Sequence, residues 1–289
     1  MKTRLIAVAL TLCMIISLAS CSNTPTDGTS SAADSSQDTS NAPTAAPTAE
    51  PIDISGVELI NAGNLSIGVE IGYPPFEDFA EDGTTPIGYD VDFAKALGEK
   101  LGLEVNFINT AWDGIFQGID VNYDCVISAV TITEERKETM IFSDPYINNF
   151  QAVVVKADYT GEINGFTDLD GMTIALQKET TSDKLMKDYV STGTIECTIS
   201  ANEKVTTCFT QLTNGEIDAV VVDSTVAAAY LASDPDKYKL AFQDESEPEQ
   251  FGVAMGMDNT ALQTAINKAI EQLEQENYFE DSVEFWFGA

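Results

Sequence analysis

Arg136 is the residue of this chain best suited to hold an anion. It stands in the segment 131–136 (TITEER), and it is the only arginine left once the first twenty residues are set aside. Its planar guanidinium can grip a carboxylate through two parallel hydrogen bonds, which a lysine cannot do. The alternative is an ordinary surface ion pair, worth about 0 to 1 kcal/mol. Thr133 has the character of a helix N-cap, so we expect Arg136 in the first turn of a helix.

Two other segments bring polar or aromatic side chains to the ends of predicted strands. Asp223 ends the apolar run 219–222, and the stiff segment 72–76 (GYPPF) follows the apolar run 65–69. In open α/β sheets, ligands bind at the carboxyl ends of the strands. These segments are therefore candidates for a binding site, although aromatic residues beside apolar runs are more often part of the core.

The composition excludes several kinds of chemistry. Histidine is absent, which excludes mechanisms that need an imidazole base or ligand, including the serine triad. No cysteine cluster has the spacing of a zinc site, and no phosphate-binding loop is present, so we expect neither a metal nor a cofactor. The net charge of −33 argues against nucleic acid as a partner. Cys197 and Cys208 are close enough in sequence to pair, but their spacing does not establish the geometry of a disulfide.

The N-terminal segment predicts export and membrane attachment. Residues 1–20 combine a short basic start with an apolar run too short to span a membrane, which is typical of a signal peptide. Cys21 directly follows Leu-Ala-Ser and looks like a lipoprotein lipidation site. A plain signal with a chance cysteine is the alternative, and it predicts a freely soluble secreted protein. The rest of the segment 21–56 is mostly small and polar, so we expect a disordered linker.

The elements that must position these residues follow an alternating pattern. Apolar, β-branched runs predict strands, and amphipathic patterns predict helices after Asp92 and near the C-terminus. Strands separated by helices indicate an α/β fold with mainly parallel sheets covered on both faces. The predicted strands are 65–69, 105–108, 125–130, 151–155, 173–176 and 219–222.

The order of the motifs resembles one known family. The segments 72–76 (GYPPF), 88–92 (GYDVD), 112–113 (WD), 124–136 and 142–146 (FSDPY) occur in the order and at the intervals of the polar amino acid-binding proteins of bacterial ABC importers. The resemblance covers nearly all of 57–289. It implies a two-lobed periplasmic-binding-protein-like (type II) fold in which each lobe is a mainly parallel sheet flanked by helices, joined by two hinge strands.

The resemblance also implies roles for individual residues. Arg136 matches the arginine that binds the α-carboxylate of the ligand, and Asp223 matches the acid that binds its ammonium group. Family members usually carry glycine where Glu179 stands, so the backbone path there is an open question. The remaining implied ligand contacts are Thr131 and the backbone at Ala129, an aromatic wall of Tyr73, Phe76 and Trp112, the second-lobe residues Thr181 and Gln177, and Glu70 toward the distal polar group of the ligand.

These matches predict a lipid-anchored, extracytoplasmic, monomeric solute-binding protein. The first lobe is expected to comprise 57–149 with 252–289, and the second lobe 150–251. A free amino acid, with a polar or cationic side chain preferred, would be enclosed between them and delivered to an ABC permease in the membrane.

Two alternatives share this scaffold. An enzyme similar to the dehydratases of this fold could use a carboxylate such as Glu70 or Glu179 as a general acid if burial raised its pKa. A ligand-sensing lipoprotein would use the same cleft without a permease.

Overall fold

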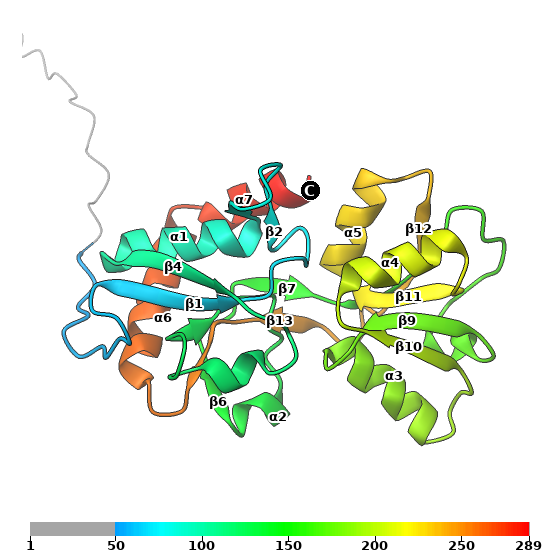
Figure 1. Ribbon diagram of the computed structural model, residues 1–289, viewed down its shortest axis with the longest axis horizontal. Helices are drawn as coiled ribbons and strands as arrows, with labels where there is room; N and C mark the ends of the chain where they lie inside the picture. Colours follow the sequence, from blue (N-terminus) through cyan, green and yellow to red (C-terminus); the bar gives the residue numbers. More distant parts are fainter. Residues whose placement is uncertain (1–49, 289) are drawn as a thin grey trace, which may run out of the picture. The chain divides into compact units, whose positions relative to one another are not determined.

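The computed structural model describes residues 50–288, and they form two five-stranded sheets joined by a short ribbon (Figure 1). The predicted signal peptide 1–20, Cys21 and the predicted linker up to residue 49 lie outside the described residues. The remaining part of that linker, 50–56, was wrongly expected to be disordered, because Ile52 and Ile54 pack against the core of the first lobe. The expected alternation of strands and helices is confirmed, and so is the two-lobed α/β fold.

The first lobe is built on a mixed sheet with the strand order β4-β1-β5-β14-β6. Strand β1 runs parallel to β4 and β5, whereas β14 is antiparallel to its neighbours β5 and β6. Five of the six residues of β1 are buried, as its apolar, β-branched sequence predicts. The strands are β1 Asn64–Val69, β4 Glu104–Asn109, β5 Cys125–Val126, β6 Met140–Phe142 and β14 Ala254–Gly256, and the main helices are α1 Tyr89–Leu101, α6 Thr260–Gln275 and α7 Tyr278–Phe287.

The second lobe has the strand order β10-β9-β11-β8-β12. Strands β10, β9 and β11 run parallel, and β8 is antiparallel to both β11 and β12. Figure 1 shows α4 and α5 on one side of this sheet and α3 on the other. The strands are β8 Gln151–Lys156, β9 Thr173–Gln177, β10 Thr198–Asn202, β11 Ala219–Asp223 and β12 Tyr238–Gln243, and the helices are α3 Thr181–Ser191, α4 Val205–Asn214 and α5 Ser224–Ser233.

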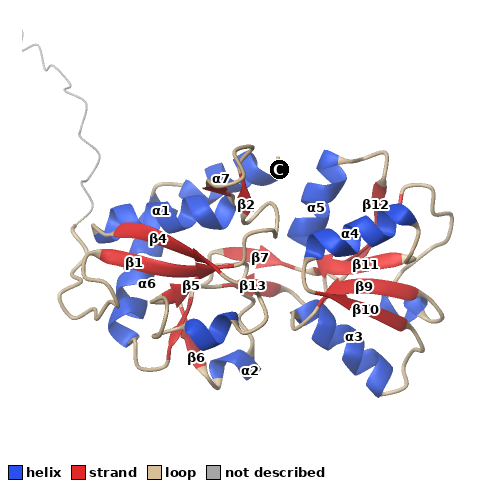
Figure 2. Cartoon of the chain, in the orientation of Figure 1, coloured by secondary structure: helices blue, strands red, loops and turns tan. Residues whose placement is uncertain are grey.

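A two-stranded ribbon joins the lobes. Strand β7 (Ile147–Asn149) pairs antiparallel with β13 (Glu249–Phe251), and Asn149 faces Glu249 in the register. Figure 2 shows this ribbon between the two sheets. The smaller elements are β2 Asp78–Phe79 with β3 Pro86–Ile87, the single-turn helix α2 Glu134–Lys137, and the 3₁₀ turns Ile115–Gly118 and Phe166–Leu169.

One predicted strand is shorter than expected. The apolar run 125–130 forms a strand only over Cys125–Val126. The backbone then leaves the sheet, and Ala129 adopts the left-handed conformation with φ of 48°. Its N–H donates to Asp90 Oδ2 at 2.6 Å and not to a neighbouring strand. Beyond Ala129 the backbone pairs with the ribbon instead, where the Gly252 N–H donates to the Val130 carbonyl at 3.0 Å and the Ile132 N–H to the Gln250 carbonyl at 2.8 Å.

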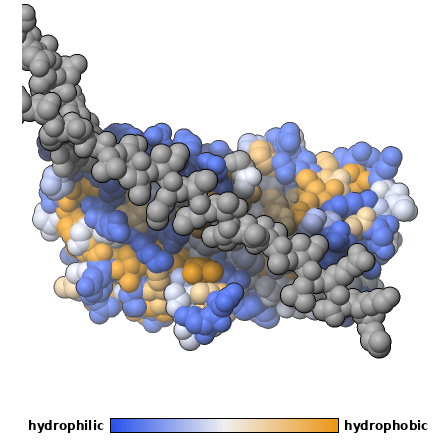
Figure 3. Space-filling model, turned by 90° about the horizontal axis from the view of Figure 1, so that it is seen from above, coloured by the Kyte–Doolittle hydropathy of each residue, from blue (hydrophilic) through white to orange (hydrophobic). Residues whose placement is uncertain are grey.

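No helix among residues 50–288 is both long and apolar enough to cross a bilayer. On the face drawn in Figure 3, hydrophilic residues surround smaller areas of hydrophobic ones.

Candidate functional site

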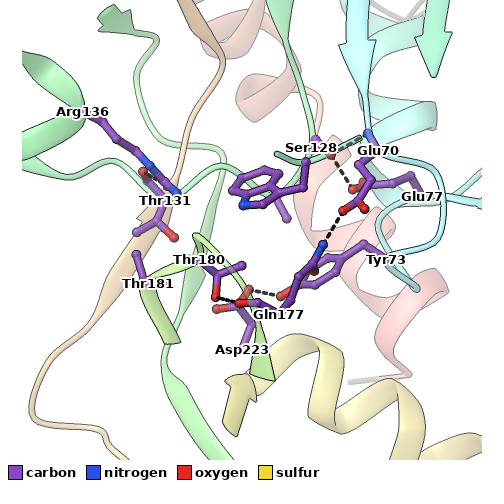
Figure 4. Close-up of a pocket in the computed structure, with 12 residues that line it drawn as sticks. Glu70, Tyr73, Glu77, Ser128, Thr131, Arg136, Gln177, Thr180, Thr181 and Asp223 are labelled. Carbon is purple, nitrogen blue, oxygen red and sulfur yellow. Dashed lines mark hydrogen bonds between the residues drawn. The ribbon is translucent and has the colours of Figure 1, made fainter. Parts of the chain in front are cut away.

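A cavity with about 300 Å³ of empty space lies where the two lobes meet. Figure 4 shows Arg136 at one end and Glu70 with Glu77 at the other. Both lobes contribute to the lining, with Glu70, Tyr73, Glu77, Trp112, Ser128, Ala129, Thr131 and Arg136 from the first and Gln177, Thr180, Thr181 and Asp223 from the second. Nine of the ten ligand contacts that the sequence predicts therefore line a single cavity.

Arg136 is positioned by the short helix α2. The Thr133 hydroxyl accepts a hydrogen bond from the Arg136 N–H at 3.1 Å, which confirms Thr133 as the N-cap. Nη1 of Arg136 donates to the carbonyl of Thr131 at 2.8 Å. Its Cζ lies 5.5 Å from the centre of the Trp112 ring and 5.2 Å from that of Phe116. One side of the guanidinium is thus fixed by the chain, and the aromatic rings orient its plane.

The charge of Arg136 is governed by its surroundings. Burial lowers the pKa of the guanidinium, while the charges of Glu249 and Asp223 act in the opposite direction. Arginine remains a cation under these conditions because its ordinary pKa is above 12. The first end of the cavity is therefore positively charged.

Asp223 supplies a negative charge from the second lobe. It ends β11, is only 6% exposed, and accepts hydrogen bonds from Tyr73 Oη at 2.5 Å, Asn149 Nδ2 at 2.7 Å and Gln151 Nε2 at 3.0 Å. Burial, followed by the charge of Glu249, raises the pKa of Asp223 to about 7. Since Tyr73 belongs to the first lobe, its hydrogen bond to Asp223 crosses the cleft.

Glu249 on the ribbon was not predicted from the sequence. Its Oε2 accepts from Asn149 Nδ2 at 3.1 Å, from Gln151 Nε2 at 3.0 Å and from Thr181 Oγ1 at 3.4 Å. Asn149 and Gln151 therefore bridge Glu249 and Asp223. This arrangement depends on the register that places Glu249 opposite Asn149, a pairing across one hundred residues that no local pattern reveals.

The opposite end of the cavity is acidic. Glu70 is 3% exposed and follows β1 directly, as the sequence predicts for a strand-end residue. Its Oε2 accepts a hydrogen bond from Gln177 Nε2 at 2.7 Å, so the second lobe contacts this acid. Burial raises the pKa of Glu70, while Gln177 and Lys204 lower it.

Glu77 adds a second carboxyl group at this end and was also missed. Its Oε1 accepts from Ser128 Oγ at 2.7 Å, and the Ser128 hydroxyl in turn accepts from the Glu70 N–H at 3.1 Å. Burial and the neighbouring Asp90 raise the pKa of Glu77 well above its usual range. The signal in the sequence was its place directly after the Pro-Pro-Phe turn, which carries it into the cavity.

Asp90 lies behind the cavity and fixes the backbone of Ala129. Burial raises the pKa of Asp90 to about 7, although Ala129 N–H and Tyr146 Oη donate to its Oδ2. Within residues 50–288, the second oxygens of Asp90 and Glu77 have no hydrogen-bond partner. Two adjacent buried carboxyl groups hold a proton more tightly than either would alone. The N–H of Ala129 is committed to Asp90, so only its other atoms face the cavity.

The second lobe reaches the cavity through the N-terminus of α3. This helix begins at Thr181, and Thr180 caps it by accepting from the Asp183 N–H at 3.3 Å. Glu179, which stands where the family usually has glycine, keeps a left-handed backbone with φ of 61°. Its N–H donates to Asp183 Oδ2 at 2.8 Å. The glutamate therefore adopts a backbone conformation that glycine accommodates more easily.

The aromatic wall differs from the prediction in one residue. Tyr73 and Trp112 line the cavity, but Phe76 does not. Phe76 is fully buried in the core of the first lobe, with its ring 5.4 Å from Phe251 and 5.8 Å from Tyr89. The tight turn at 74–75 directs the rings of Tyr73 and Phe76 to different surroundings, and the local sequence does not separate them.

The three cysteines that the structure describes are not cross-linked. Cys125, Cys197 and Cys208 are free thiols. The possible disulfide between Cys197 and Cys208 is therefore not formed. Over the described range 50–288, no group of three or more histidine, cysteine or acidic side chains is arranged to hold a metal ion.

Known proteins with similar sequences and structures bind amino acids. Residues 65–289 match the bacterial extracellular solute-binding proteins, family 3. The chain is 30% identical over 231 residues to ABC transporter arginine-binding protein 1 of Escherichia coli K12, covering 78% of this chain and 91% of that protein. It is 32% identical over 229 residues to the L-cystine-binding protein TcyJ of the same strain, covering 78% and 84%. The crystal structure of the ancestral amino acid-binding protein AncCDT-1, a precursor of cyclohexadienyl dehydratase, is similar with a TM-score of 0.72 and 32% identity, covering 78% of this chain and 96% of that one.

Proposed function

The chain belongs to family 3 of the bacterial extracellular solute-binding proteins, and we propose that its cavity captures one free amino acid between Arg136 and Asp223. The observation that carries this proposal is that a guanidinium from the first lobe and a carboxylate from the second line the same cavity. An α-amino acid carries a carboxylate and an ammonium group on the same carbon atom. A zwitterion between these two residues would satisfy both charges and link the lobes.

The rest of the lining supports a polar side chain on the ligand. Trp112 and Tyr73 offer apolar surface for the aliphatic part of such a side chain. Beyond them, Glu70 and Glu77 can accept hydrogen bonds at the far end. A ligand with an acidic side chain would be disfavoured, because a further carboxylate would lie against two buried carboxyl groups. The proposed ligand is therefore an amino acid with a distal donor, either an amide or a cation.

In this proposal, the lobes comprise 57–149 with 252–289 and 150–251, and they close around the ligand. The ribbon of β7 and β13 gives the closing motion its axis. Closure would bring Thr181 and Asp223 to a ligand already held by Arg136, and it would exclude water from the charged hydrogen bonds. Several such bonds at about 1.5 to 3 kcal/mol each, less the cost of ordering, are compatible with micromolar affinity, about −8 kcal/mol.

Delivery to an ABC permease completes the proposed function. The arginine- and cystine-binding relatives support a role in amino acid import outside the cytoplasm. We further propose that the mature protein is a monomer anchored to the outer surface of the cell membrane through a lipid on Cys21. The support for the anchor is the Leu-Ala-Ser-Cys motif at 18–21.

Arg136→Lys tests the anion-binding end of the site. The substitution keeps the charge but removes the second parallel hydrogen bond, so affinity for amino acids should fall at least about tenfold. Isothermal titration with the amino acids that bind the wild-type protein measures the effect, and thermal unfolding checks that the fold is intact. Unchanged affinity would contradict the proposed role of Arg136.

Asp223→Asn tests the proposed ammonium-binding end of the site, again by isothermal titration. The change should weaken binding of an amino acid more than binding of its deaminated analogue, because only the amino acid carries the ammonium group. Equal losses for both ligands would exclude Asp223 as the ammonium ligand.

Chromatography of the recovered ligand addresses the dehydratase alternative, which requires a new product and not the unchanged amino acid.

A further inference from the structure

A second cation meets the acidic end of the cavity from behind. Lys204 directly precedes α4 in the second lobe, and its Nζ lies 3.5 Å from Glu70 Oε1. The same Nζ donates to the carbonyl of Ile71 at 2.8 Å. Glu70 lines the cavity and its side chain is 4% exposed, whereas the Lys204 side chain is 44% exposed and lies outside the lining. Glu70 thus has the cavity on one side and an ammonium group on the other.

The surrounding backbone leaves space for this ammonium group. Gly72 has φ of 124°, and a Cβ at this position would lie 3.1 Å from Lys204 Nζ. Any other residue at position 72 would therefore strain the backbone and crowd the lysine. The other oxygen of Glu70 accepts from Gln177 Nε2, which also donates to the Glu203 carbonyl at 3.0 Å. Both oxygens of Glu70 are approached by second-lobe donors that the lobe interface holds in place.

We propose that Lys204 determines specificity by neutralising Glu70, so that the far end of the cavity prefers a neutral hydrogen-bonding side chain to a cationic one. The inference rests on the proposed capture of an amino acid and narrows its ligand class. A cationic side chain would bring a second positive charge to a carboxylate that already pairs with Lys204. This repulsion acts across the buried carboxylate of Glu70, and solvent screens it only on the exposed side of Lys204. A neutral amide or ureido group donates hydrogen bonds to Glu70 without that repulsion.

Arginine and citrulline form a matched ligand pair for the test, since they have nearly the same shape and differ in charge. Titration calorimetry, extended to millimolar ligand, gives the ratio of their dissociation constants for the wild-type protein and for Lys204→Met. Loss of the ammonium group should shift the ratio at least about tenfold toward arginine. Lys204→Gln provides a second neutral variant if the methionine variant does not fold, as judged by thermal unfolding.

Two control variants separate charge from lobe closure. Lys204→Arg keeps the positive charge and should leave the ratio within about twofold of the wild-type value. Lys184→Met removes a different ion pair, between Lys184 Nζ and Glu135 Oε2 at 2.7 Å, which also joins the lobes but is exposed on both sides. It should weaken both ligands equally.

The inference would be overturned if the ratio of the arginine and citrulline dissociation constants did not change in the neutral Lys204 variants. It would also be overturned if Lys184→Met shifted this ratio as much as the neutral Lys204 variants do. Failure of these neutral variants to bind either ligand at millimolar concentration would also overturn it. The proposed function fails in a distinguishable way, because then no amino acid would bind the wild-type protein at all.

Discussion

At the scale of single residues, the site is defined by ionisable groups that are buried and therefore lose the favourable hydration of their charged forms. Asp223 and Asp90 both lie in surroundings that raise their pKa to about 7. Arg136 is desolvated in the same cavity, which lowers its pKa. An amino acid brings both compensating charges at once. The unliganded site therefore carries an electrostatic cost that a zwitterion is suited to relieve.

The raised pKa of Asp223 predicts that affinity falls as the pH falls below about 7. The ligand ammonium group needs the ionised carboxylate, and at lower pH the unliganded protein holds a proton on Asp223. Affinity should decrease by up to about tenfold per pH unit between pH 7 and pH 5. Titration calorimetry with a ligand whose side chain is neutral measures it. Asp223→Asn should remove most of this dependence, and constant wild-type affinity from pH 8 to pH 5 would contradict the prediction.

The raised pKa of Asp223 also makes the free energy of unfolding depend on pH. The direction is opposite to that of a carboxylate whose pKa is lowered by folding. Between the ordinary pKa of 3.8 and the folded value of about 7, the folded protein binds more protons at Asp223 than the unfolded chain does. Stability from this group is therefore fully present below about pH 4 and is lost as the pH rises from there through 7. Asp90 acts in the same direction.

At the scale of elements, strands and helix starts were predictable because they depend on near neighbours. Buried strands such as β1 and β11 are recognisable in the sequence as apolar runs. Thr133 is recognisable as an N-cap because the N–H that donates to its hydroxyl belongs to Arg136, only three residues later. The residues that were missed depend on distant partners. Glu77 bonds to Ser128, 51 residues away, and Glu249 meets Asn149 only through the ribbon. Phe76 was misplaced because its ring packs on Phe251, near the other end of the chain.

The turn before α3 predicts a stabilising substitution. Glu179 has φ of 61° and an exposed side chain, and a left-handed conformation costs a residue with a Cβ about 1 kcal/mol or more. Glu179→Gly should raise the free energy of unfolding by about 1 kcal/mol in urea denaturation, since the gain in the folded state exceeds the added entropy of the unfolded chain. Glu179→Ala is the matched control because it keeps the Cβ. A glycine variant no more stable than the alanine variant would refute the argument.

At the scale of the whole molecule, several contacts between the lobes are made by polar groups that meet across the cleft. Tyr73 and Asp223, Glu70 and Gln177, and Lys184 and Glu135 pair in this way. The first two of these pairs are buried, whereas the exposed pair of Lys184 and Glu135 contributes little, about 0 to 1 kcal/mol. A bound ligand that contacts both lobes should therefore add substantially to the stability of the closed form.

Ligand binding should accordingly raise the thermal unfolding midpoint. A ligand at about 100 times its dissociation constant stabilises the folded protein by about 2.7 kcal/mol, which corresponds to a shift of about 5 to 10 °C for a protein of this size. Thermal unfolding with each of the common amino acids, together with cystine, ornithine and citrulline, measures the shift. The Arg136→Lys variant serves as the control with a reduced response. If no amino acid moves the midpoint, amino acid capture is excluded.

The placement of β14 has a consequence for how the chain acquires its structure. Strand β14, at Ala254–Gly256, lies between β5 and β6, although both of these precede the entire second lobe in the sequence. The second lobe is continuous from β8 to β12 and can fold as soon as its residues are available. The sheet of the first lobe lacks the strand between β5 and β6 until residues 254–256 have been synthesised. A chain cut short before residue 254 would thus retain one foldable lobe and leave the arginine-bearing half incomplete and open to proteolysis.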